Sequence, residues 1–495
     1  MKKNIMVHCS LRSHQKLFNY SCILVFMCFL LMTSCEDGLK EEPKSLAVET
    51  FYNSPAEVVT AVNAVYSPLR LAYYTIGFSS VHADYAIGRG SWSALNDFQG
   101  LNSVWMTRTS EVWNYYYLSI RNANIVIANI SKGNAISQGD VDNYVAEVKF
   151  LRAFTYFQLV RYWGGVPIRT EANLTDIQVK RNSTDEVYNL IISDLQEAEN
   201  KLPDQQLVSG RPSKWAAKTL LADVYLQLSK YSEARDKAKE VIQSNKYALV
   251  AVTSTMDFQN IFGPNVITNS EEIFYLKYSH LIGQGDTWPG LMNHPGTNLY
   301  GKGGGVYGVH SDLNNFVYAN WDNNDLRKGN WYVWNIGLGS TSILSKKLID
   351  PDNTLGLSGA GNPETWYRYA DLLLIYAEAS FRVANVPTSE AMEALNEVHR
   401  RAYGYSPKVP SIVDFKITDY NGNSFLDLII KERGYEFQLE GKRWLELKRT
   451  GKLVATILAV KGKVVTEKDY LWPIPVNELT SNKALDPSKD QNPGY

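Results

Sequence analysis

The sequence predicts an all-α protein in which a helical scaffold carries one large, loop-rich inserted lobe. Residues 211–244 have apolar and small residues at the spacing of two packed helices, and several other stretches repeat a helical period. Between Gly283 and Gly308 there are nine glycines, a density that regular helix does not tolerate. Helical stretches resume after residue 362, so the glycine-rich part lies between two portions of the scaffold.

The helical pair at 211–244 has the spacing of a tetratricopeptide hairpin, in which a small residue lets two helices approach and a tyrosine fills the gap. The matching positions are Leu221, Ala222, Tyr225, Ser229, Tyr231 and Ala234. Lys218 departs from the pattern, because the repeat usually has an aromatic residue there. Ser213 is expected to cap the first helix. Since such a pair cannot bury its apolar face alone, further helical pairs are expected.

The same 3.6-residue period predicts the other scaffold helices. Those before the hairpin are expected at 54–71, 109–130, 141–163 and 184–201. Ser54 followed by Pro55 is a typical helix start, and the Gly-Gly-Val-Pro run at 164–167 is a typical stop. Residues 73–101 lose the period and predict a long loop, a kind of segment that is often functional.

Three helical stretches are predicted after the glycine-rich part. They are 365–382, 389–402 and 425–450, the last of them broken at Gly441, and the end of the chain at 471–495 is expected to be loop. We therefore expect a single domain at 35–495. Its scaffold should occupy about 50–250 and 362–460, and its binding lobe about 251–361.

The first 34 residues have the features of an export signal. Basic residues precede an apolar run at 22–32, which is shorter than the roughly 20 residues that a membrane-spanning helix requires. The run ends in Leu31-Met32-Thr33-Ser34-Cys35, which resembles the lipobox of bacterial lipoproteins. Cleavage before Cys35 would make it the lipid-bearing first residue. An ordinary secretory signal with an incidental cysteine is the alternative.

The cysteine count favours lipidation. The chain has four cysteines, and the three others fall inside the segment to be removed, so Cys35 has no partner for an internal disulfide. Acylation is then the expected role of Cys35. Glu36 and Asp37 follow it, and acidic residues at this position resemble the surface-export signal of some Gram-negative lipoproteins.

Charge and motifs argue against several functional classes. Lys plus Arg is 50 and Asp plus Glu is 51, so the net charge of -1 gives no electrostatic reason to expect nucleic acid. The chain has neither H-E-x-x-H nor G-x-S-x-G. Gly303 to Gly308 matches G-x-G-x-x-G, but no predicted strand precedes it. No cofactor, catalytic residue or metal ligand is predicted, although a calcium site of loop carboxylates stays open.

Glu432, Glu436 and Glu440 are spaced to share one face of a predicted helix. Glycosidase carboxyls instead face each other across a cleft, about 5 to 9 Å apart, with the sugar between them. Neighbours on one helix cannot do this. A structural ion-pair network is expected instead, with the basic residues Lys431, Arg433, Arg443 and Arg449.

Several further motifs occur in order along the chain. They are the Arg152-Ala153 helix, Trp163-Gly164-Gly165-Val166-Pro167, the run Tyr369 to Ala379, the run Glu432 to Trp444, Trp472-Pro473-Ile474-Pro475 and Gln491-Asn492-Pro493-Gly494-Tyr495. In these residues, and in the lipobox, the chain resembles the SusD-like (RagB/SusD) family of surface nutrient-binding lipoproteins. The resemblance spans essentially the whole mature chain. Gly434 departs from it, because the family more often has arginine there.

What the resemblance implies is a tetratricopeptide-containing lipoprotein, anchored in the outer membrane and facing the cell exterior. Such proteins cap a TonB-dependent, SusC-like transporter and hand it oligosaccharides, which they bind and do not cleave. Some relatives serve peptide import, so a peptide- or protein-binding lipoprotein of tetratricopeptide type is the alternative function. An exported glycoside hydrolase is a third class, but no catalytic constellation supports it.

A glycan site is expected to combine an exposed ring with a few polar groups, because a sugar has an apolar C–H face and a polar edge. The loop 73–101 and the glycine-rich lobe offer such groups. The candidate ligand-binding residues are Arg89, Trp92, Asn96, Trp288, Tyr307 and Trp331. For each ring, burial in the core is the alternative. If the rings form one binding surface, segments about 200 residues apart in sequence must converge in space.

Overall fold

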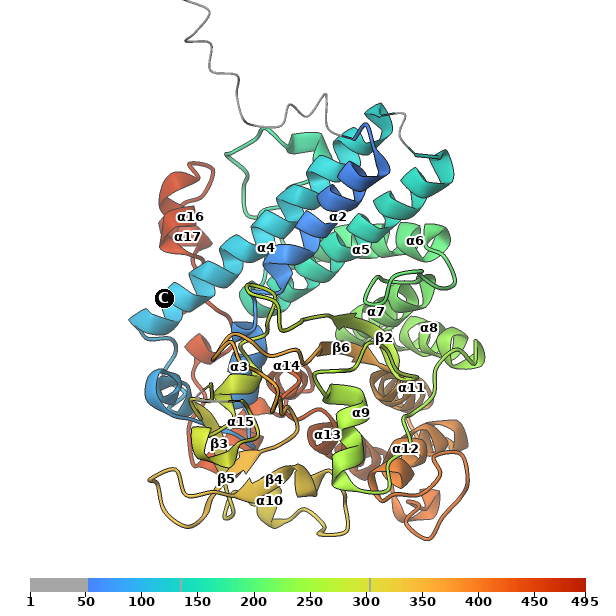
Figure 1. Cartoon of the computed structure of the whole chain (residues 1–495), viewed down its shortest axis with the longest axis vertical. Helices are drawn as coiled ribbons and strands as arrows, with labels where there is room; N and C mark the ends of the chain where they lie inside the picture. Colours follow the sequence, from blue (N-terminus) through green and yellow to red (C-terminus); the bar gives the residue numbers. More distant parts are fainter. Residues whose placement is uncertain (1–51, 134–135, 302–303) are drawn as a thin grey trace, which may run out of the picture. The chain divides into compact units, whose positions relative to one another are not determined.

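The structure is a computed structural model that describes residues 52–133, 136–301 and 304–495. The predicted signal segment and Cys35 lie outside the described residues. Helices predominate in the described part, which confirms the predicted all-α class (Figure 1). Within these ranges, no helix combines the length and the apolar character needed to cross a membrane.

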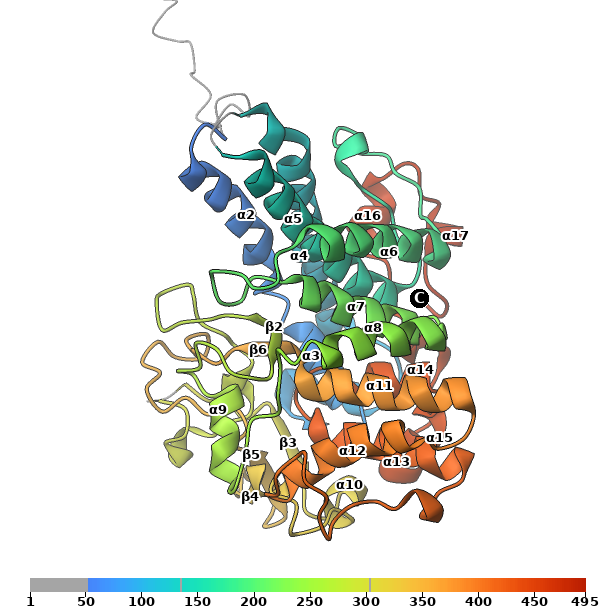
Figure 2. The ribbon, with the colours of Figure 1, turned by 90° about the vertical axis from the view of Figure 1, so that its right-hand side faces the viewer.

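The scaffold is a succession of packed helices. α4 packs on α5, and the packing continues in order through α6, α7 and α8. α8 then packs on α11, and α11 on α12, although the loop-rich segment separates α8 from α11 in sequence (Figure 2). The bounds are α2 Pro55–Leu69, α4 Ser103–Asn129, α5 Gln138–Trp163, α6 Thr184–Lys201, α7 Lys214–Gln227, α8 Tyr231–Gln243, α11 Tyr369–Ala384, α12 Ser389–Ala402 and α13 Gly422–Glu436.

Several helix ends follow the predicted signals. The Ser54 side chain accepts a hydrogen bond from the Glu57 backbone N–H, and the Glu57 carboxylate accepts one from the Ser54 N–H, which caps α2. α5 stops where Gly164 takes a φ of +75°, a conformation that favours glycine. α6 and α12 coincide with the predicted ranges.

The predicted pair at 211–244 is present as α7 and α8, which pack on each other. Ala222 and Ala234, the small residues of the pattern, are fully buried. Ser213 is the N-cap residue of α7, as predicted, but its hydroxyl makes no cap bond and lies 3.4 Å from the Tyr247 hydroxyl. The tetratricopeptide register itself stays a prediction.

The prediction of a loop at 73–101 is wrong. The segment contains helix α3, strand β1 and a 3-10 helix, at Tyr74–Val81, Ile87–Gly88 and Gly90–Asn96. Every residue of α3 from Thr75 to Val81 is buried, including the polar residues Thr75, Ser79 and Ser80. A helix buried on all sides shows no amphipathic period, which is why periodicity missed it.

Two other predicted boundaries need correction. Residues 364–368 form strand β6 and not the start of a helix, because they pair with β2. The C-terminal segment predicted as loop contains two short helices, α16 Val476–Ser481 and α17 Pro487–Asp490. The break predicted at Gly441 is present but wider, since α13 ends at Glu436 and α14 begins at Arg443, with Leu439 at φ +64° between them.

The inserted lobe contains short strands among long loops. β1, β3, β5 and β4 form one sheet in that order, and β2 pairs with β6 in another, all antiparallel. The strand bounds are β2 Glu272–Leu276, β3 Val309–Asp312, β4 Trp331–Val333, β5 Ser342–Ser345 and β6 Glu364–Arg368. The lobe also contains helices α9 Gln259–Phe262 and α10 Phe316–Ala319, whereas α14 Arg443–Arg449 and α15 Leu453–Lys461 follow α13. Strand β1 thus connects the N-terminal part of the chain to the lobe.

Candidate functional site

The two predicted binding segments converge in space. The ring centroids of Trp92 and Trp288 lie 6.1 Å apart, and Trp92 also packs edge-on against Trp105 at 4.9 Å. However, the expectation that these rings are exposed is wrong. The exposed fraction is 4% for Trp92, 1% for Trp288 and 7% for Trp331. These three indoles belong to the core that supports the surface.

Hydrogen bonds within the protein explain why two of these indoles can be buried. The Trp288 ring N–H donates to the backbone oxygen of Leu439 at 3.0 Å, and that of Trp331 donates to the Gln438 side-chain oxygen at 2.6 Å. A buried indole N–H usually has such a partner. Both acceptors lie in the 437–442 break after α13, and sequence spacing alone does not bring them to the tryptophans.

Asn96 has a positioning role in the structure. Its side-chain oxygen accepts a hydrogen bond from the Gly88 N–H, and its amide donates to the Gly88 carbonyl, both at 2.8 Å. This pair of bonds joins the end of the 3-10 helix to the end of β1. Asn96 therefore fixes the backbone next to Arg89.

Arg89 and Tyr307, the other two predicted residues, lie side by side and are both partly exposed. They meet because β1 and β3 are antiparallel, with Gly88 opposite Val309, and because the Arg89 N–H donates to the Gly308 carbonyl at 2.8 Å. The guanidinium carbon of Arg89 lies 4.4 Å from the centre of the Tyr307 ring. This is a cation–π contact at the surface.

Two partly exposed residues extend this contact. These residues are His294 and Trp334. The centroid of the His294 ring lies 4.5 Å from that of the Tyr307 ring and 5.8 Å from that of the Trp334 ring. Trp334 follows β4, and its backbone N–H donates to the Ser342 carbonyl at 3.0 Å. Neither His294 nor Trp334 was predicted as a site residue. The sequence signal was weak, a histidine before Pro-Gly and one tryptophan among several in the lobe.

We call Arg89, His294, Tyr307 and Trp334 the Arg89 cluster. The residues come from the ends of strands in one sheet and from the loop before β3, so the four-stranded sheet brings them together. They present aromatic faces next to N–H donors. Nδ1 of His294 accepts a hydrogen bond from the Gly296 N–H at 3.0 Å, so in the neutral ring the other nitrogen carries the proton and can donate.

The backbone around Tyr307 is tightly constrained. Tyr307 has a φ of +38°, which is uncommon for a residue with a side chain. A Cβ on Gly305 would lie 2.2 Å from the Asn293 backbone oxygen, and one on Gly308 would lie 3.2 Å from the Trp92 ring. Strained residues of this kind cluster at binding sites, where the surrounding structure holds them in place.

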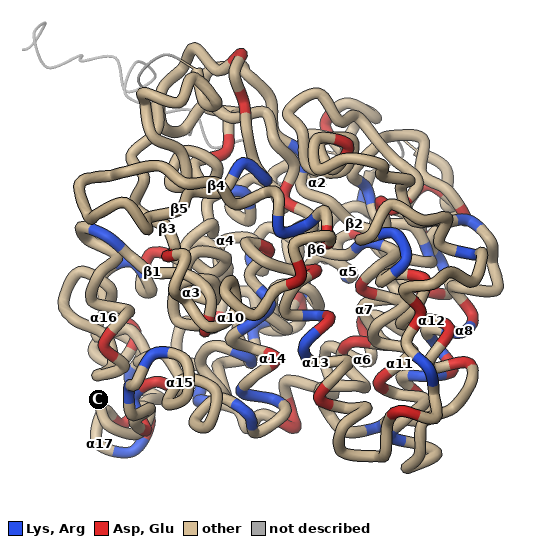
Figure 3. The backbone as a smooth tube through the Cα atoms, turned by 90° about the horizontal axis from the view of Figure 1, so that it is seen from below, with Lys and Arg blue, Asp and Glu red and all other residues tan. Residues whose placement is uncertain are grey.

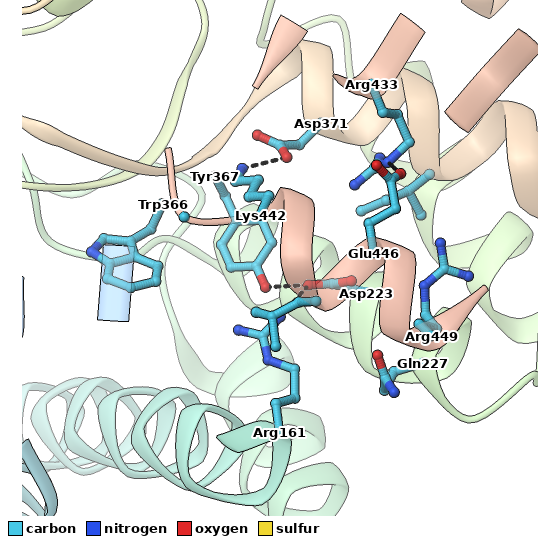
Figure 4. Close-up of a pocket in the computed structure, with 13 residues that line it drawn as sticks. Arg161, Asp223, Gln227, Trp366, Tyr367, Asp371, Arg433, Lys442, Glu446 and Arg449 are labelled. Carbon is cyan, nitrogen blue, oxygen red and sulfur yellow. Dashed lines mark hydrogen bonds and ion pairs between the residues drawn. The ribbon is translucent and has the colours of Figure 1, made fainter. Parts of the chain in front are cut away.

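A pocket between α5, α7, α11 and α14 contains many charged side chains, but it is not a sugar site (Figure 4). Lys442 pairs with Asp371, Arg433 pairs with Glu446, and the Tyr367 hydroxyl donates to Asp223 at 2.6 Å. The cavity has a volume of about 40 Å³. That holds water molecules but not a sugar, since ligand pockets measure about 300 to 1,000 Å³.

The predicted ion-pair network is present, but its partners are not those expected. Glu432 contacts Arg327 at 2.7 Å, and Glu436 contacts Arg368 at 2.6 Å. Glu440 lies beyond the end of α13 and contacts Arg368 at 2.8 Å. Of the expected partners, Arg433, Arg443 and Arg449 pair with Glu446, Asp84 and Glu378, because the buried face of α13 packs against distant segments. The Lys431 ammonium instead lies 5.7 Å from the centre of the Tyr435 ring. Figure 3 shows many charged residues on α8 and α11 to α14, whereas β4 and β5 are tan throughout.

The pKa values of these glutamates do not suit general acid catalysis. Burial opposes ionisation of Glu432, but Arg327 and His399 outweigh it and lower its pKa to about 2. Burial likewise opposes ionisation of Glu440, and Arg368 and Lys347 lower its pKa to about 2. A general acid needs a pKa raised toward neutrality, so these carboxylates are structural.

One carboxyl pair has raised pKa values. Burial raises the pKa of Asp286 to about 7, and burial together with the negative charge of Asp286 raises the pKa of Glu364. The cavity beside them measures about 20 Å³, too small for a sugar between two carboxyls.

Within 52–133, 136–301 and 304–495, no group of three or more His, Cys, Asp or Glu side chains lies close enough together to hold a metal ion.

Comparison with known proteins identifies the family. A family model described as starch-binding and associating with the outer membrane matches residues 39–226, and the SusD family model matches residues 278–495. The chain belongs to the SusD family. The SusD-like protein P2 of Formosa agariphila is 29% identical over 96% of this chain and 99% of its own length.

Solved structures, including one of a SusD superfamily protein, share the fold. A SusD superfamily protein from Parabacteroides distasonis has a TM-score of 0.74 and 26% identity, over 89% of this chain and 99% of its own. Surface glycan-binding protein A from Bacteroides thetaiotaomicron has a TM-score of 0.71 and 23% identity, over 90% of this chain and 100% of its own. These comparisons confirm the resemblance to the SusD family.

Proposed function

We propose that this SusD-family protein captures oligosaccharides at the cell surface through the Arg89 cluster and delivers them to a SusC-like TonB-dependent transporter. The observation that carries the proposal is the convergence of Tyr307 and Trp334 with Arg89 and His294 at a partly exposed surface. Aromatic faces next to hydrogen-bond donors match the apolar face and the polar edge of a sugar. The family description as starch-binding and the name of the surface glycan-binding neighbour support a glycan ligand.

In this proposal the protein binds sugar without cleaving it. The glutamates of the network are paired and ionised, and the cavity next to the Asp286–Glu364 pair is too small for a sugar. Incubation of the protein with a bound oligosaccharide should therefore leave the chain length unchanged, as measured by chromatography. Appearance of shorter products from homogeneous protein would contradict the proposal.

A glycan array probed with the mature protein tests the ligand class. Tyr307→Ala and Trp334→Ala should each weaken binding of the best glycan by about 5- to 150-fold, because each removes a stacking ring worth about 1 to 3 kcal/mol. Tyr405→Ala is the matched control, because Tyr405 is 40% exposed and lies outside the cluster. Binding to peptides and to no sugar would instead support the peptide-import alternative.

A further inference from the structure

We propose that the Arg89 cluster selects acidic oligosaccharides, whose carboxylate or sulfate groups bind the guanidinium of Arg89. This inference rests on the proposed function and specifies its ligand. It concerns the charge of the sugar, whereas the proposed function requires only that a sugar binds.

The first support is that Arg89 has no anionic partner in the part of the chain that the structure describes. Within the described residues, its guanidinium has no ion pair and no hydrogen bond, only its contact with the Tyr307 ring. The buried arginines of this protein differ, because Arg152, Arg327 and Arg368 each contact a carboxylate at 2.6 to 2.7 Å. A guanidinium has five N–H donors in a planar fork that matches a carboxylate. Those of Arg89 face solvent or a ligand.

The second support is the absence of acidic residues in the segments that form the site. Residues 87–96, 293–308 and 331–345 contain no Asp or Glu. Two acidic residues lie just beyond these segments, and each has a partner of its own. Asp97, after the first segment, pairs with Lys463 at 3.0 Å, and Asp312, at the end of β3, accepts a hydrogen bond from the Thr341 hydroxyl at 2.6 Å. A neutral sugar presents hydroxyl donors that a carboxylate accepts well, and these segments supply none.

The third support is that His294 also presents a donor. Because its Nδ1 accepts the Gly296 N–H, the free ring nitrogen carries the proton next to Tyr307 and Trp334. The polar groups of the cluster are therefore mainly donors. A ligand whose edge consists of acceptor oxygens, as in a uronate or a sulfated sugar, complements them, and hydrogen bonds to an ionised group are the stronger kind.

The test compares oligosaccharides that differ only in charge. One pair is oligogalacturonate and its methyl ester, and the other is a sulfated carrageenan oligosaccharide and its desulfated form, each titrated into the mature protein alongside the array. The acidic member of at least one pair should bind about 10- to 150-fold tighter, the range expected for a charge-assisted hydrogen bond. Added salt should weaken only that member. The pair that shows the preference distinguishes carboxylate from sulfate.

Substitution of Arg89 assigns the preference to this residue. Arg89→Met removes the charge and should abolish the difference between the acidic and the neutral member, while Arg89→Lys should retain part of it. Arg121→Met is the matched control, because Arg121 is an exposed arginine on α4 outside the cluster and its loss changes the net charge equally. Thermal melting of each variant checks that Arg89, which is partly exposed, can be changed without loss of fold.

The outcomes separate this inference from the proposed function. Equal affinity for both members of every pair, or a preference for the neutral member, would overturn the inference and leave glycan capture standing. An acid preference that survives in Arg89→Met would also overturn it. Binding to no glycan at all on the array would overturn the proposed function and the inference together.

Discussion

Neighbouring aromatic residues in this protein differ in burial, and burial predicts a different role for each. Trp92 is enclosed by Trp105, Trp288 and the backbone of Gly308, whereas Tyr307, next to Gly308 in sequence, reaches the surface. A buried ring contributes mainly to the stability of the fold, and an exposed ring contributes mainly to binding.

Trp92→Ala should destabilise the protein by roughly 3 to 5 kcal/mol, because it leaves a cavity between two other indoles. Tyr307→Ala should change the free energy of unfolding little. Thermal melting and urea unfolding of both variants measure the difference. Equal stability of the Trp92 variant and the wild type would show that Trp92 is not packed as described.

The raised pKa of Asp286 predicts that the stability of the protein depends on pH. Burial raises its folded-state pKa from 3.8 to about 7, so between these values the folded state binds more protons than the unfolded state. The contribution of this group to stability is therefore largest below about pH 4 and is lost as the pH rises through 7, by at most about 1.4 kcal/mol per pH unit.

Asp286→Asn tests this pH dependence. Asparagine cannot ionise, but it keeps a side-chain oxygen that can accept the hydrogen bond from the Trp288 backbone N–H. The stability of the variant relative to wild type should rise from pH 4 to pH 7, as measured by urea unfolding across this range. A constant difference between the two proteins would mean that Asp286 does not titrate there.

Among the elements, the loop before β3 determines the geometry of the Arg89 cluster. The Tyr307 N–H donates to the Asn293 carbonyl at 3.0 Å, and the Asn293 side chain donates to the carbonyls of Pro289 and Leu348 at 2.9 and 3.0 Å. The loop is thus held from inside the protein. Its glycines permit the close backbone approach that these bonds require.

Gly305→Ala should displace this loop, because the added Cβ would lie 2.2 Å from the backbone oxygen of Asn293. We expect a loss of glycan affinity at least as large as that of Tyr307→Ala, about 5-fold or more. Gly139→Ala is the control, since its nearest neighbour would lie 3.8 Å away, the Ser137 hydroxyl. Unchanged affinity in the Gly305 variant would contradict the role of the loop.

The whole molecule combines the proposed surface binding site with an expected lipid anchor at Cys35. Cys35→Ala should release the protein from membranes, because Cys35 is the only cysteine left after the predicted cleavage. One acyl chain binds membranes only weakly, so we expect more than one on the wild type. Fractionation should be done in cells that lack the transporter. A variant that stays with the outer membrane there would refute the anchor.

The transporter partnership is a separate prediction. A tethered binding protein keeps its ligand at high effective concentration only where the tether places it, so a position next to a pore makes capture useful. Pull-down in mild detergent from native membranes should recover a SusC-like protein together with this chain. Repeated recovery of this chain alone would count against the partnership.

Local sequence features predicted most helices of the scaffold. α6 and α12 have the predicted bounds, the α7–α8 pair was recognised, and the family motifs were assigned correctly. The helix bounds rest on contacts between residues three or four apart, which the sequence displays directly. α3 and β1 were missed because one is buried on all sides and the other has only two residues.

Only the tertiary structure determined which candidate residues reach the surface. Arg89 and Tyr307 were predicted and lie together, whereas Trp92, Trp288 and Trp331 are core residues, and His294 and Trp334 were missed. The exposure of a ring depends on segments far away in sequence, such as the 437–442 break that accepts the N–H bonds of Trp288 and Trp331. The sequence alone determined the family and the helical framework, because both depend on local patterns. Which side chains the lobe exposes depends on long-range packing, and a single sequence does not show that packing.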